Sequence, residues 1–173
     1  MNRISALTIA AGRADHLYNV VAGFQAQTVQ PDELIIGVMQ PELYDHLPET
    51  DFPVRQIQVT ADELPLAAAR NAVAHAATGD LLVFVDVDCI PHPDLVLDYL
   101  RHARAQSGLL MGEVGYLPGN ATQNGLNYDH FEQVAQRHSD RQAPPAEGLR
   151  RCEDYRCFWS LNFAMDRDSW RAS

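Results

Sequence analysis

The sequence contains no lysine, since all 13 of its basic residues are arginine. A P-loop needs a lysine on the phosphates and a pyridoxal phosphate enzyme needs one for its Schiff base, so both classes are excluded. The pattern G-x-G-x-x-G does not follow the first predicted strand, which argues against a common dinucleotide-binding fold. A phosphate-bearing ligand would therefore depend on a metal ion or on a few well-placed arginines.

Cysteine and long apolar runs are also scarce. The chain has three cysteines, Cys89, Cys152 and Cys157, and they form no C-x-x-C pair, so neither a disulfide framework nor a common metal knuckle is expected. No apolar run approaches the length of a membrane helix, and the first residues lack the apolar stretch of a signal peptide. We expect a cytoplasmic protein without a transmembrane segment, and peripheral attachment at the inner membrane stays open.

Length and charge narrow the class further. With 173 residues, 46% of them hydrophobic, the chain is long enough for one domain with a real core, and we expect a single domain over residues 1–173. The net charge of -10 and the absence of a dense arginine cluster argue against a nucleic-acid partner. The seven histidines form no H-x-x-x-H pair, so a zinc site is not expected.

Predicted strands and helices alternate along most of the chain. Runs rich in β-branched residues predict strands over residues 5–11, 34–39, 54–59, 81–85, 109–114 and 158–165. Helical spacing predicts helices over residues 17–24, 65–77, 93–107 and 126–137, and Asp168 with Ser169 is expected to cap a last helix. This alternation predicts an α/β fold with a mainly parallel mixed sheet flanked by helices.

The most informative motif is an Asp-Val-Asp triplet at residues 86–88, directly after the apolar run of residues 81–85. Ligands of parallel sheets bind beyond the carboxyl ends of the strands, so both carboxylates are expected where a ligand would lie. If the triplet continues the extended strand, Asp86 and Asp88 point to the same side. Two hard oxygen ligands suit Mg²⁺ or Mn²⁺ holding a diphosphate, whereas the alternative interpretation is a solvated turn after the strand.

Three segments together resemble the family 2 type glycosyltransferases, which have the Rossmann-like GT-A fold. They comprise residues 7–36, residues 68–88 and residues 158–167, and they span nearly the whole chain. The second is the most specific, since it joins Arg70 and Asn71 to the triplet. The resemblance implies a metal-dependent enzyme that moves a sugar from a nucleoside diphosphate to an acceptor hydroxyl, with inversion at the sugar.

The resemblance also implies roles for individual residues. It assigns the metal to Asp88, together with Asp86, and the ribose to Asp86. It assigns the nucleotide to Ala10, Ala11, Arg13, Arg70, Asn71, Asp86 and Val87. The family usually has an acidic residue after the second strand to contact the base, but this chain has Gln40, whose amide could also bind a base. This departure leaves the base open: a UDP-sugar is the favoured donor only as a prior, with GDP-sugars and dTDP-sugars as alternatives.

The general base is the least defined part of this prediction. In the family, a glycine-rich turn and an acidic pair follow a segment like residues 158–167, and we expect that segment beyond Ser173. Glu153 and Asp154 are the nearest acidic pair, and they precede the third segment rather than follow it. Within this sequence, they are the candidates for the carboxylate that deprotonates the acceptor.

Two other functions fit parts of the sequence. A chain without its base could be a non-catalytic nucleotide-sugar-binding module or a fragment of the enzyme. Residues 83–88 also resemble the first motif of haloacid dehalogenase type phosphatases, although that motif normally opens its chain and the lysine is missing. For the transferase, the acceptor could be a saccharide, a lipid-linked group or a protein.

Overall fold

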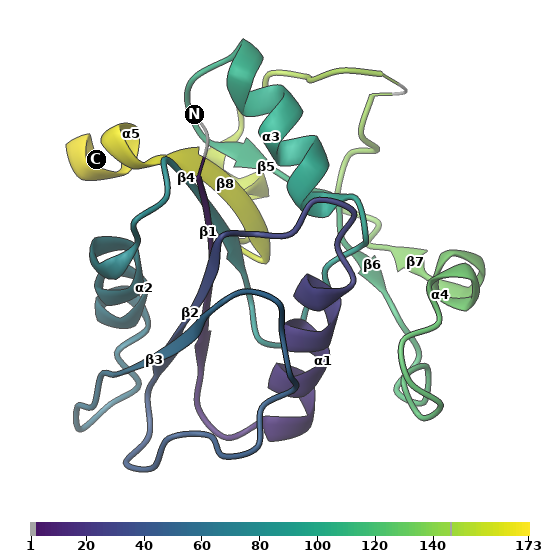
Figure 1. The fold of residues 1–173 in the computed structure, drawn as a ribbon. Helices are drawn as coiled ribbons and strands as arrows, with labels where there is room; N and C mark the ends of the chain where they lie inside the picture. Colours follow the sequence, from purple (N-terminus) through teal and green to yellow (C-terminus); the bar gives the residue numbers. More distant parts are fainter. Residues whose placement is uncertain (1–2, 146) are drawn as a thin grey trace.

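A six-stranded mixed sheet forms the centre of the computed structural model, which describes residues 3–145 and 147–173 (Figure 1). The strand order is β3-β2-β1-β4-β8-β5; the first four pair in parallel, and β8 runs antiparallel to both β4 and β5. The strands are β1 (Ile4–Ala10), β2 (Glu33–Val38), β3 (Val54–Gln58), β4 (Leu81–Val85), β5 (Leu110–Met111) and β8 (Asn162–Asp166). Because β1, β2 and β4 are neighbours and parallel, their carboxyl ends meet at one edge.

Helices cover both faces of this sheet, as Figure 1 shows. One face packs against α1 (Ala14–Gln25) and α3 (Leu95–Ala105), and the other against α2 (Leu66–Ala76) and α5 (Arg167–Ala172). Side chains alternate along the central strand, so Ala6 joins the core under α1 while Leu7 joins the core under α2. Strands buried on both faces read as continuous apolar runs, which is why β1, β2 and β4 could be predicted.

The second half of the chain differs from the sequence expectation at several points. The strand predicted over residues 109–114 is only two residues long, and the last strand begins at Asn162 rather than at residue 158, because a 3₁₀ turn (Tyr155–Cys157) precedes it. A separate two-stranded sheet pairs β6 (Gly115–Tyr116) with β7 (Gln136–Arg137), and α4 (Tyr128–Val134) lies in the connection between these strands. The last helix is capped by Asp166, whose carboxylate accepts from the Ser169 amide, and not by the predicted Asp168 and Ser169.

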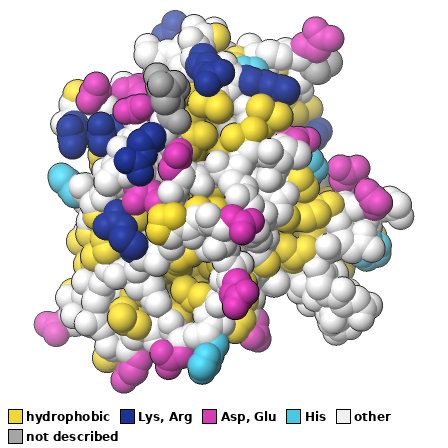
Figure 2. All heavy atoms as spheres, in the orientation of Figure 1, with side chains coloured by type: hydrophobic (Ala, Val, Ile, Leu, Met, Phe, Trp, Pro, Cys, Tyr) yellow, Lys and Arg dark blue, Asp and Glu magenta, His cyan; other side chains and the backbone are white. Residues whose placement is uncertain are grey.

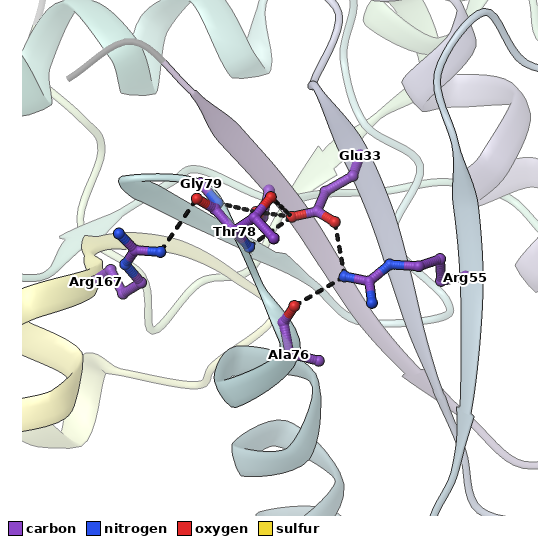
Figure 3. A network of polar contacts seen from close by, with 7 residues as sticks. Glu33, Arg55, Ala76, Thr78, Gly79 and Arg167 are labelled. Atoms are coloured by element: carbon purple, nitrogen blue, oxygen red, sulfur yellow. Dashed lines mark hydrogen bonds and ion pairs between the residues drawn. The ribbon is translucent and has the colours of Figure 1, made fainter.

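A polar network closes the opposite edge of the sheet, at the amino ends of β1, β2 and β4 (Figure 3). The Glu33 side chain is buried, and its carboxylate accepts hydrogen bonds from Ser5, from the amide and hydroxyl of Thr78, and from Arg55, at 2.7 to 2.8 Å. Arg167 adds a hydrogen bond to the Thr78 carbonyl. This network therefore joins the starts of three strands to the end of α2.

No helix within the described residues is long and apolar enough to cross a membrane.

Candidate functional site

The candidate site lies at the carboxyl ends of β1, β2 and β4, where three loops converge. These loops carry Gly12 and Arg13, Gln40, and the triplet of residues 86–88. On the face drawn in Figure 2, arginine side chains gather in the upper half and acidic side chains line the lower edge, towards which β1 runs. An anionic ligand at this edge therefore needs positive charge supplied locally by the site itself.

Arg70 and Asp86 form the inner of two ion pairs. The guanidinium of Arg70, on α2, lies 2.9 Å from Asp86 Oδ1, and the two side chains are 22% and 25% exposed. Arg70 also contacts the Ser160 hydroxyl at 3.4 Å, while the Asp86 amide donates to the Leu161 carbonyl at 2.8 Å. Burial raises the pKa of Asp86, and the hydrogen bond and charge of Arg70 oppose that rise. The pair thus ties α2, the end of β4 and the loop before β8 together.

Arg13 and Asp88 form the outer pair, with 2.7 Å between the guanidinium and Asp88 Oδ2 and with side chains 56% and 45% exposed. The triplet was expected to continue the extended strand, but it does not. It forms a turn after β4, closed by a hydrogen bond from the Cys89 amide to the Asp86 carbonyl, so each aspartate faces a different arginine. Burial raises the pKa of the Cys89 thiol to about 12, with the charges of Asp88 and Asp86 adding to the effect.

The backbone that presents Arg13 is in an unusual conformation. Gly12 has a φ of 59° and Arg13 a φ of 51°, so two successive residues are left-handed. Only glycine adopts this region without cost, and a left-handed arginine is held there by its surroundings. The Gly12 amide donates to Gln40 Oε1 at 2.6 Å, and the Gly12 carbonyl accepts from the Tyr44 hydroxyl at 2.5 Å.

Gln40 and Tyr44 therefore act as a clamp on the turn. Gln40 also donates from its Nε2 to the Glu42 carbonyl at 2.9 Å, so both ends of its amide have partners within the protein. Contact between Gln40 and a base stays a prediction; its amide keeps one acceptor lone pair and one N–H for such a contact. Tyr44 was not anticipated, although an aromatic residue in a long connection between two strands is a signal for such an anchor. Burial raises the pKa of its hydroxyl.

The other residues predicted to contact the nucleotide lie at different depths. The side chains of Ala10 and Val87 are buried in the core, so only their backbone faces the site, and Ala11 is half-buried. Asn71 is exposed and borders a hollow of about 420 Å³ with His75 and Trp170. Among the contacts described, none joins Asn71 to either aspartate.

The two candidates for the general base lie outside this cluster of contacts. Glu153 is exposed, and Asp154 caps the 3₁₀ turn and pairs with Arg156 at 2.8 Å. The hydrogen bonds from Arg156 lower the pKa of Asp154, which weakens it as a base. In the described part of the chain, no contact links either residue to Asp86 or Asp88, and their catalytic role stays a prediction.

The side chains present could hold a divalent cation only weakly by themselves, and the phosphates of a bound ligand would complete its coordination. The described residues contain no cluster of three or more Asp, Glu, His or Cys side chains able to hold a metal. Two carboxylates remain, and each has one oxygen held by an arginine. Mg²⁺ is commonly bound by one or two carboxylates together with substrate phosphates, and Asp86 and Asp88 suit that arrangement.

Comparison with known proteins identifies the fold and the family. The crystal structure of S. aureus TarS 1-349 matches with a TM-score of 0.50 at 14% identity, over 70% of this chain and 40% of that one. The same protein in complex with UDP-GlcNAc matches with a TM-score of 0.50 at 14% identity, over 70% of this chain and 38% of that one. This chain thus spans about two fifths of the TarS chains it resembles.

No curated protein matches the sequence. The family model described as Glycosyl transferase family 2 matches residues 40–170, which is well over half of the chain. The predicted GT-A type fold, a mainly parallel mixed sheet flanked by helices, is confirmed. The chain belongs to glycosyl transferase family 2.

Proposed function

We propose that this chain binds a nucleoside diphosphate sugar, in the first place a UDP-sugar, and serves the transfer of the sugar to an acceptor hydroxyl. The observation that carries the proposal is the double ion pair at the ends of β1 and β4: Arg13 with Asp88, and Arg70 with Asp86. Two arginines and two carboxylates at one strand edge can receive both a diphosphate and the cation that accompanies it.

Different residues of the site would contact different parts of the nucleotide-sugar donor. Asp86 is half-buried and fixed by Arg70, which suits a carboxylate that accepts hydrogen bonds from a ribose. Asp88 is more exposed and would hold Mg²⁺ or Mn²⁺, with Asp86 beside it. When bound, the cation would neutralise the charge that collects on the diphosphate as the bond to the sugar breaks. Arg13 and Arg70 offer further donors to the diphosphate oxygens.

A uridine base is favoured because the protein with the matching fold was crystallised in complex with UDP-GlcNAc. Inversion at the sugar requires a carboxylate that deprotonates the acceptor on the side opposite the leaving group. The acceptor could be a saccharide, a lipid-linked group or a protein. A non-catalytic binding module is the second candidate, since the Asp154 carboxylate is tied to Arg156.

Calorimetric titration of UDP, GDP and dTDP with and without Mn²⁺ tests the donor site. We expect Mn²⁺ to tighten UDP binding at least about tenfold, and Asp88→Asn to abolish that gain. Asp98→Asn is the matched control, because Asp98 is an exposed carboxylate paired with Arg101 on α3, away from the site. An Asp88→Asn protein that keeps the full Mn²⁺-dependent gain would contradict the cation role.

A second assay separates the enzyme from the binding module. Release of UDP from UDP-GlcNAc, alone and with a panel of acceptors, measures turnover directly. Turnover supports the transferase, whereas tight metal-dependent binding without any turnover favours the module.

A further inference from the structure

Arg13 reaches Asp88 across 75 positions of sequence, from the loop after β1 to the turn after β4. Its backbone is left-handed and held on both sides: the Arg13 carbonyl accepts from the Leu17 amide at 3.0 Å, while Gln40 and Tyr44 hold Gly12. The side chain beyond this fixed backbone is more than half exposed. The backbone of Arg13 is thus held in place, while its exposed guanidinium can exchange partners.

The two ion pairs of the site differ in how firmly they are held. Arg70 has Ser160 as a further partner and is only 22% exposed, so its contact with Asp86 is enclosed by protein. The contact of Arg13 with Asp88 is exposed, so water and salt screen it and it contributes little to stability. Breaking the outer pair therefore requires little free energy, whereas breaking the inner pair requires more.

A divalent cation and a guanidinium compete for the same Asp88 carboxylate. Both are positive, so a cation at Asp88 repels Arg13, and a diphosphate bound at the same edge offers the guanidinium new anionic oxygens. We propose that Arg13 holds Asp88 in the cation-free protein and passes to the diphosphate when Asp88 takes up the cation. This inference rests on the proposed donor site and adds that Arg13 makes cation binding and nucleotide binding depend on each other.

The proposal predicts opposite effects of Arg13 on the two ligands. In Arg13→Gln, Mn²⁺ alone should bind up to about fivefold more tightly, because no ion pair has to be broken. UDP in the presence of saturating Mn²⁺ should bind about tenfold more weakly, because a charge-assisted hydrogen bond to the diphosphate is lost. The factor by which UDP tightens Mn²⁺ binding, and by linkage Mn²⁺ tightens UDP binding, should therefore shrink.

Titration of Mn²⁺ followed by its electron paramagnetic resonance signal, with and without UDP, measures these affinities in the full chain. Arg141→Gln is the matched control, since Arg141 lies near enough to influence Cys89 electrostatically but hydrogen-bonds the Gly112 carbonyl instead of Asp88. We expect the control to keep the wild-type coupling. Thermal melts check that both variants are folded.

Three outcomes would overturn the proposal. If the wild-type chain shows Mn²⁺-dependent UDP binding and Arg13→Gln binds Mn²⁺ no more tightly, the exchange is wrong and the donor site stands. If Arg141→Gln reproduces the Arg13→Gln effects, the cause is general charge and not the ion pair. If the wild-type chain shows no Mn²⁺-dependent UDP binding, the cation role in the proposed function fails together with the exchange.

Discussion

Replacing Glu33 by glutamine should make the stability of the protein less dependent on pH. Glu33 is buried at the start of β2, where hydrogen bonds from Ser5, Thr78 and Arg55 reach its carboxylate. Burial by itself would raise its pKa, but these hydrogen bonds outweigh burial and lower the pKa from 4.5 to about 2. The carboxylate is therefore held in its charged form by the folded protein.

The size of the effect follows from the two pKa values. The shift from 4.5 to about 2 corresponds to roughly 3 kcal/mol of folding free energy at neutral pH. Because the folded pKa is the lower one, this contribution is complete above 4.5 and is lost as the pH falls towards 2. By linkage, about 1.4 kcal/mol of it should be lost between pH 7 and about pH 3.5.

Urea unfolding of the wild type and of Glu33→Gln at both pH values tests this account. Glutamine does not titrate, so the difference in unfolding free energy between the two proteins should shrink by about 1.4 kcal/mol at the lower pH. Other carboxylates titrate equally in both proteins and cancel in the difference. A difference that stays constant between the two pH values would refute the assignment of the low pKa to Glu33.

Two further predictions concern the site. Arg70→Met leaves the half-buried Asp86 carboxylate without its cation and should lower the free energy of unfolding in urea by about 1 to 3 kcal/mol. Adding Asp86→Asn should recover part of that loss. A double variant less stable than Arg70→Met alone would contradict the ion-pair account. At about pH 8 a thiol reagent should label the exposed Cys152 and spare Cys89, because burial raises the pKa of Cys89 to about 12. Mass spectrometry of the digested protein identifies the labelled cysteines. Labelling of Cys89 would contradict this prediction.

The first half of the fold could be predicted because its signals are local. The strand at residues 81–85 is a continuous apolar run between polar turns, and the helix over residues 66–76 follows Pro65. The second half could not be predicted as well, because the position of β8 between β4 and β5 depends on tertiary contacts and not on local sequence. Phe158 reads as strand, yet the 3₁₀ turn after Asp154 delays the strand to Asn162.

The proximity of four candidate residues was predicted because the resemblance gave motifs, whereas the contacts between loops were missed; the roles of these residues stay predictions. Arg13, Arg70 and the two aspartates lie together, as the sequence led us to expect. Which arginine pairs with which aspartate depends on the turn of the triplet and on the left-handed backbone at Gly12, and neither has a clear signal in the sequence. The hold of Tyr44 on Gly12 joins loops that are 32 positions apart.

Carboxylate–arginine pairs occur at both edges of the parallel part of the sheet, and they differ in how deeply they are buried. At the amino end, the Glu33 side chain is 5% exposed and its oxygens are occupied by protein donors, so replacing Arg55 would leave a buried carboxylate without its cation. At the carboxyl end, Asp88 is 45% exposed, and water or a ligand can take the place of its arginine at little cost. The same chemical pair therefore stabilises the fold where it is enclosed, and it can exchange partners only where the loops leave it open to solvent.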